Sequence, residues 1–412
     1  MNSTPNASAM LNRLQQYGVA AGAIGTVLSL LSLFQGLDRF MHSYLFAFCY
    51  WNGLGLGCMA LLMLNYVAGG RWGAVTRRFL EAGALTLPAM FVLFIPIALG
   101  TRHLYVWALP GTKAGVASVH PHKARYLTSE FFGLRGFFYF ALWIAIAAML
   151  RRWSLEEDKD EKDSKDSKDS KDNKDDKYKS KNLSGRDKLQ YISGPGLIVY
   201  VLAASFAAFD WTMSLEPDWY STIYGLVVIV GQGLTALVLC ILSMRFLMRA
   251  APLDQTVTRD DFHDFGNLLL VFVMLSAYMS FSQFLIIWSG NLPEESAWYI
   301  RRSQGGWQWI AAFLAGCHFL APFLILLFRS VTYNAARLAG VAALLAATHL
   351  CQCYWWVMPS FDASAIPHLS DIAAPLALGG IWLIVFVHFL KRAPLLSLAE
   401  TEWVRAEVGG RK

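Results

Sequence analysis

The chain has 412 residues, of which 56% are hydrophobic, 14% are aromatic and only 16% are charged. Soluble domains carry about a quarter charged residues, so this composition excludes a large soluble redox or nucleotide-binding domain and indicates a membrane protein. The net charge of +6 does not indicate a nucleic-acid partner, because no folded soluble face is left to carry a basic patch.

Ten apolar stretches are long enough to cross a bilayer, which takes about 20 residues. The first is longer than a signal-peptide core and lacks a small-residue cleavage site, so it is predicted to be a retained helix. The predicted fold is therefore an all-α integral membrane protein of about ten transmembrane helices. In chain order the stretches cover 17–36, 43–68, 81–100, 130–150, 195–215, 221–247, 265–289, 306–329, 335–357 and 371–391.

The helices divide the chain into a polar N-terminal segment (1–16), four helices (17–150), a charged loop (151–194), six helices (195–391) and a tail (392–412). An even number of helices places both termini on one side. Basic residues are more frequent on that side, so the positive-inside rule predicts that the N-terminal segment, the charged loop and the tail are cytoplasmic.

Within the charged loop, residues 156–181 are a near-balanced mixture of Lys and Asp with a repeated Lys-Asp-Ser triplet. The segment has no apolar face to bury and is predicted to be a disordered, solvated insertion. A docking tail is the alternative.

The six cysteines all lie in apolar stretches, and no CxxC or CxxCH motif occurs. Neither an iron–sulfur cluster nor a c-type haem therefore has its usual ligand spacing. Cys351-Gln-Cys353 is more typical of core packing than of a metal site. No catalytic residue and no metal ligand is predicted.

Ionisable groups inside a membrane span are costly, so each is a functional candidate. Asp210 lies about 22 Å along the fifth predicted helix. Ser214 follows at i+4 on the same face, and Glu216 lies at the helix mouth. Proton exchange or ligand binding by Asp210 and a helix-bridging role both stay open.

Other polar side chains reach the same outer half of the membrane and suggest an outward-facing polar cavity that serves as a proton path or quinone site. Arg135 is predicted to be a snorkelling or paired charge. His318 and His349 differ by roughly 5 Å in depth, so a bis-histidine haem is geometrically conceivable, although a histidine bonded to a neighbouring helix is more common. The full set is Glu130, Arg135, Gln283, His349, His318 and Asp371.

Two long motifs carry a resemblance to a known family. They are residues 209–225 (FDWTMSLEPDWYSTIYG) and residues 279–295 (MSFSQFLIIWSGNLPEE), the second followed by Trp298-Tyr299. With them the chain resembles the F subunit of bacterial alternative complex III, a quinol:electron acceptor oxidoreductase, in the polysulfide-reductase-like (NrfD-like) membrane-anchor family. The resemblance covers about residues 17–392, and the lysine–aspartate insertion departs from the family pattern.

This resemblance implies two four-helix bundles with the first and last helices outside them. It implies that the chain is a subunit of a respiratory quinol:cytochrome c (or other acceptor) oxidoreductase in the bacterial cytoplasmic (inner) membrane, and that it is not catalytic alone. The subunit would contribute to quinone binding or to a transmembrane proton path. The implied partners are membrane lipid, a related quinol-binding membrane subunit, and periplasmic multihaem cytochrome and iron–sulfur subunits, with a terminal oxidase as a further candidate. No covalently bound cofactor is expected; menaquinone or ubiquinone would be shared with partner subunits.

The alternative function is a free-standing multi-helix transporter or permease. Inverted repeats with two interrupted helices at the membrane midplane would favour it. The sequence contains no convincing internal repeat.

Overall fold

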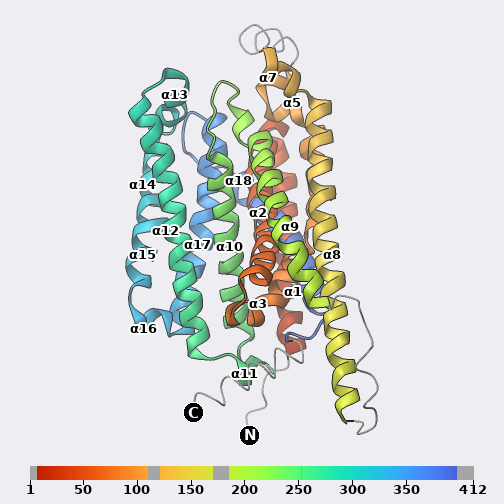
Figure 1. Ribbon diagram of the computed structural model, residues 1–412. Helices are drawn as coiled ribbons and strands as arrows, with labels where there is room; N and C mark the ends of the chain where they lie inside the picture. The colour runs from red at the N-terminus through yellow and green to blue at the C-terminus, as the bar shows by residue number, and fades with distance from the viewer. Residues whose placement is uncertain (1–6, 110–120, 170–184, 252, 397–412) are drawn as a thin grey trace.

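The computed structural model of this chain describes residues 7–109, 121–169, 185–251 and 253–396. These residues form helices, turns and loops, with no strand among them. Ten helical segments within the described ranges are long and apolar enough to cross a membrane, and they stand side by side in one bundle (Figure 1). The predicted all-α, multi-helix membrane fold is therefore confirmed.

The spanning helices are α1 (Ala7–Ser32), α2 (Leu37–Ala68), α3 (Arg71–Ala84) with α4 (Leu87–Leu99), α8 (Ser129–Asp169), α9 (Gly185–Trp211), α10 (Tyr224–Leu247), α12 (Arg259–Gly290), α14 (Trp307–Leu314) with η5 (Ala315–Leu320) and α15 (Ala321–Leu326), α17 (Ala335–Val357) and α18 (Leu369–Leu390). Short helices fill the connections: η1 (Leu33–Gln35), α5 (Thr101–Leu104), η2 (Val106–Ala108), α7 (Pro121–Tyr126), η4 (Met213–Leu215), α11 (Leu253–Thr256), α13 (Pro293–Arg301), α16 (Arg329–Thr332) and η6 (Met358–Ser360). We call the end of the bundle with α5, α7 and α13 the outer end, and the end with α11 and α16 the inner end (Figure 1).

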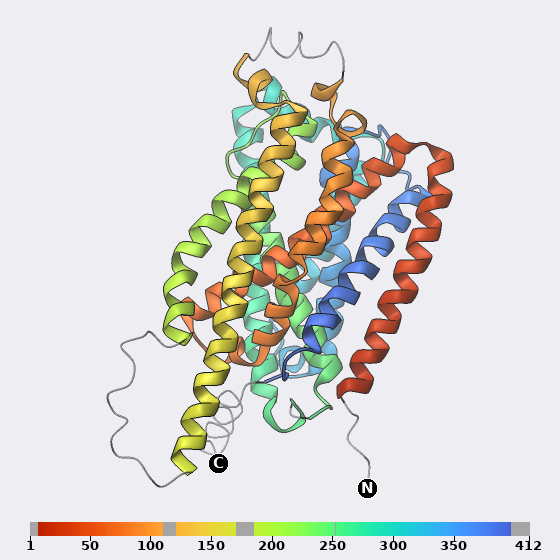
Figure 2. The same cartoon turned by 90° about the vertical axis from the view of Figure 1, so that its right-hand side faces the viewer.

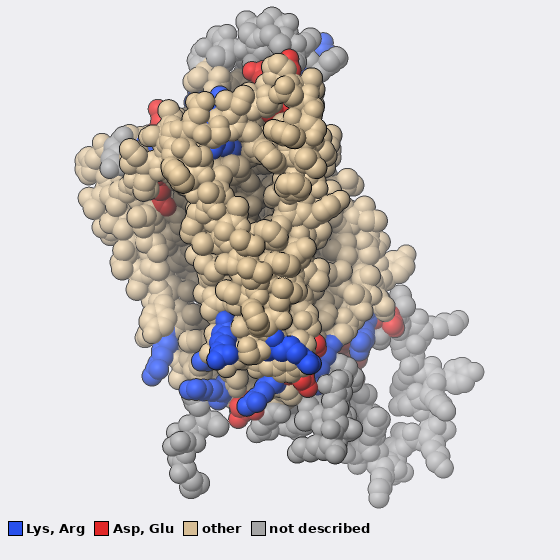
Figure 3. All heavy atoms as spheres, turned by 90° about the vertical axis from the view of Figure 1, so that its left-hand side faces the viewer, with Lys and Arg blue, Asp and Glu red and all other residues tan. Residues whose placement is uncertain are grey.

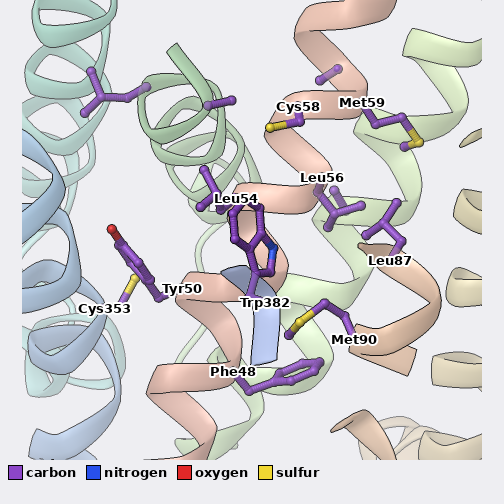
Figure 4. Close-up of a cluster of buried hydrophobic side chains, with 14 of the residues drawn as sticks. Phe48, Tyr50, Leu54, Leu56, Cys58, Met59, Leu87, Met90, Cys353 and Trp382 are labelled. Carbon is purple, nitrogen blue, oxygen red and sulfur yellow. The ribbon is translucent and has the colours of Figure 1, made fainter. Parts of the chain in front are cut away.

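Helix α2 is the centre of the bundle. Of its apolar window 89% is buried, against 22% for α12 and 17% for the segment 307–326. It packs against α3, α9, α10, α17 and α18, and its side chains point toward several of these neighbours (Figure 4). Phe48 and Leu56 are almost completely buried, as are Leu87 and Met90 of α4. A helix that is apolar all round belongs inside a bundle, which explains this position.

The other helices form two groups around α2, which matches the two four-helix bundles expected. Helices α3, α4, α8 and α9 pack with α2 in one group, and α10, α12, α14–α15 and α17 form the other. Helices α1 and α18 pack on each other at one edge (Figure 2). Their backbones approach so closely that a Cβ on Gly25 would lie 2.2 Å from the backbone nitrogen of Ala377.

The third spanning segment differs from the prediction of 81–100. It runs from Arg71 to Leu99 and is interrupted at Leu85–Thr86, so that α3 and α4 are separate helices. Pro88 lies in the first turn of α4, where proline is tolerated because its missing N–H would have no helical partner. Pro88 therefore lies directly after a break between two helices.

Two helix ends also differ from the predictions. Helix α1 begins at Ala7 and not at Tyr17, and the side chains of Asn12 and Gln15 accept hydrogen bonds from Lys391 after α18. Helix α8 continues to Asp169, so the first half of the segment predicted to be disordered is helical. The remainder, 170–181, lies outside the described residues.

The outside of the bundle has the charge distribution of a membrane protein. On the face in Figure 3 the middle carries few charged side chains, and Lys and Arg gather at the inner end. Large apolar side chains of α12 and α14, such as Ile286, Trp288 and Trp309, are more than 60% exposed. Such a surface is compatible with contact to lipid.

Candidate functional site: a buried polar cavity

A small cavity lies inside the bundle between α2, α9, α10 and α17. It measures about 30 Å³. A buried water needs roughly 10–15 Å³, so the cavity has room for about two water molecules, whereas small-molecule pockets start near 300 Å³. Its polar and thiol lining consists of Asn52, Thr212, Gln232, His349, Cys49 and Cys353.

Two histidines stack beside this cavity. The rings of His318 and His349 have centroids 5.9 Å apart and planes inclined by 27°. Nδ1 of His318 lies 2.8 Å from the hydroxyl of Thr348, and Nδ1 of His349 lies 3.0 Å from Oε1 of Gln352. Nε2 of His318 is buried without a hydrogen-bond partner among the described residues, and Nε2 of His349 faces Sγ of Cys353 at 3.9 Å. Each ring is thus oriented through Nδ1, and Nε2 of His318 is left for a water or a proton.

The position of His318 depends on an irregular helix. Residues 315–320 form a π-helical segment, η5, and Pro322 follows in the first turn of α15. Proline cannot donate the backbone hydrogen bond that a regular α-helix would need there. Single π-turns of this kind often occur at functional sites. This π-helical turn carries His318, whose Nδ1 reaches Thr348 of α17.

Polar side chains of α2, α9 and α10 continue the polar interior. The hydroxyl of Tyr200 donates to Oε1 of Gln232 at 2.6 Å. Oδ1 of Asn52 is buried with no partner in the described structure, as expected for a group that faces water in a cavity. Helices α2 and α10 touch at Gly57, where a Cβ would lie 1.9 Å from the carbonyl oxygen of Gln232.

The histidine pair does not fit a bis-histidine haem. A macrocycle would have to lie between the two imidazoles, and the cavity that His349 lines measures about 30 Å³, which is too small for one. Among the described residues, no group of three or more His, Cys, Asp or Glu side chains could hold a metal ion.

Asp210, near the outer end of α9, lies in a buried ion pair. Its Oδ1 and Oδ2 accept hydrogen bonds from Nη2 and Nε of Arg135, both at 2.8 Å, and Oδ2 accepts a third from Tyr139 at 2.8 Å. The Arg135 guanidinium donates to the carbonyl of Tyr126 at 2.9 Å and lies 3.7 Å above its ring. Arg135, predicted to be a snorkelling or paired charge, is paired with Asp210 in the structure, and this geometry favours the helix-bridging role of Asp210.

Glu216 belongs to a different ion pair. It accepts hydrogen bonds from Nη1 of Arg302 at 2.9 Å and from Ser360 at 2.8 Å. Burial lowers the pKa of Arg302 to about 10, with the Glu216 carboxylate opposing the shift, so the guanidinium is charged at neutral pH. Ser214 donates to the backbone carbonyl of Asp210 at 2.5 Å. The structure therefore does not bring Asp210 and Glu216 together in one cavity.

Asp371 and Glu130 lie at helix starts away from the cavity. Asp371, in the first turn of α18, pairs with Arg39 at 2.6 Å and accepts from Ser43 at 2.6 Å, which ties α18 to α2. Glu130 is exposed in the first turn of α8, where a carboxylate complements the helix dipole. Neither residue contacts the histidine pair.

The two motifs that carry the family resemblance meet at the outer end. The hydroxyl of Ser221 donates to Oε1 of Gln283 at 3.1 Å, and the indole of Trp219 donates to the carbonyl of Glu295 at 3.1 Å. Trp219 also stacks on Trp298 at 4.8 Å. The motifs are thus parts of one tertiary unit, and Gln283 belongs to it rather than to the cavity.

Sequence analysis missed a buried charge cluster near the inner end. Glu81 accepts hydrogen bonds from Arg77 at 3.0 Å, Arg78 at 2.9 Å and Arg151 at 2.7 Å. The i, i+4 spacing of Arg77 and Glu81, which suits an ion pair on one helix, is the signal that could have revealed it. Arg77 and Arg78 precede the predicted stretch 81–100, so they were expected in a loop.

Comparison with known proteins adds no relative: a scan against protein-family models finds no matching family, and a search of curated proteins finds no match.

Proposed function

We propose that this chain is a membrane subunit of a respiratory quinol:electron acceptor oxidoreductase, similar to the F subunit of alternative complex III, and that it supplies a transmembrane proton path. The observation that supports the path most strongly is the stacked pair His318 and His349 beside a cavity of about 30 Å³. Imidazole can accept and release a proton at its ring nitrogens, and an ionisable group inside a membrane span marks a functional site by default.

The outer half of the proposed path contains more polar groups than the inner half. Thr212 and Trp211 line the cavity, and Trp211 directly follows the ion-paired Asp210. A water in the cavity can bridge polar groups that do not touch directly. Thr212, Asn52 and Gln232 provide oxygen and nitrogen atoms for a proton within the cavity next to His349.

Toward the inner end, an apolar layer follows the cavity. Gly53 and Leu56 of α2 line the cavity, and Cys58, half a turn beyond Leu56, packs against α3 close to Gly83. Glu81 and its arginines lie beyond this contact. In this proposal, the apolar layer prevents a free proton leak, and a transfer across it would be the controlled step.

The cavity does not suit a quinone ring, because it holds about two waters. A second groove, of about 100 Å³, is lined by Ser221, Gln283 and Ile286. Ile286 is 63% exposed, so the groove opens toward the lipid side, where menaquinone or ubiquinone resides. If a quinone contacts this chain, the amide of Gln283 is the group that would bind a quinone carbonyl.

The partners and location follow from the resemblance and from charge. We propose a bacterial cytoplasmic membrane, with the inner end and its basic residues facing the cytoplasm. The outer end, built by the two family motifs, would then face the periplasm. Multihaem cytochrome and iron–sulfur subunits would bind there, and the related quinol-binding subunit beside it in the membrane.

The break between α3 and α4 favours the transporter alternative, since transporters often have interrupted helices. The freed backbone groups, however, are used locally: the hydroxyl of Thr86 donates to the carbonyl of Gly83 at 2.7 Å. The interior cavity is also too small for an organic solute. The geometry therefore supports the proton path better than solute transport.

Purification of the tagged full chain from its native membrane tests the proposal. The expected result is co-purification of haem-containing subunits and quinol oxidation activity, with loss of that activity in membranes that lack the chain. A monodisperse chain without haem partners, together with full quinol oxidation in membranes lacking it, would contradict the proposal.

A further inference from the structure

A groove of about 480 Å³ lies at the inner end, between α8 and the break that separates α3 from α4. Five of its α8 residues, at positions 148, 151, 152, 155 and 159, follow the spacing of one helix face. Leu85, at the break, forms the opposite wall. The groove is part of neither the histidine cavity nor the outer unit, so it has no role in the proposed proton path.

The groove is basic at its surface. Arg152 has a side chain that is 79% exposed and Lys159 is also exposed, whereas Arg151 is paired with Glu81 at 2.7 Å. The single carboxylate of the lining, Glu156, is occupied by Arg152 at 3.4 Å and by Lys188 at 2.8 Å. The groove therefore has an excess of positive charge available for an anion.

The charges lie at the height of a lipid phosphate. Arg151 is 22 residues after the start of α8, or about 33 Å along the helix, and the hydrocarbon core is about 30 Å thick. Ala148 and Leu85, about one turn farther into the membrane than Arg151 and Glu81, line the same groove. Positive charge at the boundary above an apolar floor is complementary to a phospholipid with a negative headgroup and an acyl chain.

We propose that this groove binds an anionic phospholipid at the inner membrane surface, with its phosphate between Arg152 and Lys159 and an acyl chain against Ala148 and Leu85. Basic pockets at helix ends recognise anionic headgroups in this way. The proposal does not depend on the proposed respiratory function, because it uses other residues and a binding measurement only.

The test is a lipid titration of the purified full chain in detergent, followed by native mass spectrometry. Phosphatidylglycerol should bind more tightly than phosphatidylcholine, and Arg152→Gln/Lys159→Gln should weaken phosphatidylglycerol binding roughly thirtyfold. The control Arg329→Gln/Arg337→Gln removes two exposed arginines at the same end of the bundle and should leave the affinity unchanged.

Inorganic phosphate alone separates a lipid from a free anion. It should neither bind in the same concentration range nor displace phosphatidylglycerol. Equal binding of the two lipids, equal binding by the groove variant and the unmodified chain, or full displacement by phosphate would each overturn the proposal.

Discussion

Arg135 of α8 and Asp210 of α9 join two neighbouring helices through two parallel N–H···O hydrogen bonds of 2.8 Å each. Asp210 is 1% exposed, and the side chain of Arg135 is 10% exposed. A bidentate pair of this kind fixes orientation as well as distance. It therefore sets how α8 and α9 cross at the outer end.

Asp210→Asn should destabilise the chain by about 3–5 kcal/mol, because it leaves the Arg135 charge buried and unpaired. Thermal unfolding of the purified chain measures this. The double variant Arg135→Met/Asp210→Leu should lose less stability than the single variant, since it removes both charges. Glu130→Gln, at an exposed position on α8, is the control and should change the stability of the chain little.

A proton-exchange role of Asp210 gives a different result. If Asp210→Asn assembles with normal stability and loses proton coupling, the helix-bridging interpretation is wrong.

Arg301 and Arg302 are adjacent and should respond differently to the same substitution. Arg302 is 2% exposed, holds Glu216 at 2.9 Å and lies 3.6 Å above the Trp298 ring. Arg302→Gln should cost about 3 kcal/mol or more, because Glu216 loses its buried counter-ion. Arg301 has a side chain that is 49% exposed and lies 3.8 Å from Glu216, so Arg301→Gln should cost less than about 1 kcal/mol. If Arg301→Gln and Arg302→Gln lower the free energy of unfolding equally, burial of the arginine does not determine how much its ion pair contributes to stability.

Two deletions within the lysine–aspartate segment should also differ. Deletion of 161–181 should leave folding intact. Asp160 already accepts a hydrogen bond from the backbone N–H of Gly185 at 3.3 Å, so the two chain ends that the deletion joins are close in space. Deletion of 156–181 also removes Glu157 and Asp158, which pair with Arg77 at 2.8 Å and Arg78 at 2.5 Å. It should lower the yield of folded protein by several-fold. Size-exclusion profiles after purification measure the yield of folded protein for both deletions. If the shorter deletion does not fold, the result would support a docking role for the segment.

The helices were predictable because each apolar stretch is long enough to cross a membrane as a helix. Asp210 and Arg135 were recognisable as intramembrane charges, but the pairing of residues 75 positions apart depends on how α8 and α9 pack. The start of α3 was missed for a related reason. Arg77 and Arg78 made residues 71–80 look like a loop, whereas Glu81, Glu157 and Asp158 neutralise them inside the bundle.

The cavity was the least predictable part. The similar depth of His318 and His349 follows from counting residues, and their rings do stack. Gln232, Asn52 and Tyr200 were not singled out, because an uncharged polar residue in a span is common and its role depends on which helices face it. The π-helical turn that carries His318 likewise has no sequence signal beyond Pro322.

His349→Gln in the purified complex, reconstituted into liposomes, tests the proton path most directly. Glutamine keeps a hydrogen bond but cannot exchange a proton, so proton movement per electron should fall tenfold or more while quinol oxidation with an uncoupler persists. His388→Gln, an exposed histidine near the inner end of α18, is the control and should keep normal coupling. An assembled His349→Gln complex that moves as many protons per electron as the unmodified complex would contradict the account.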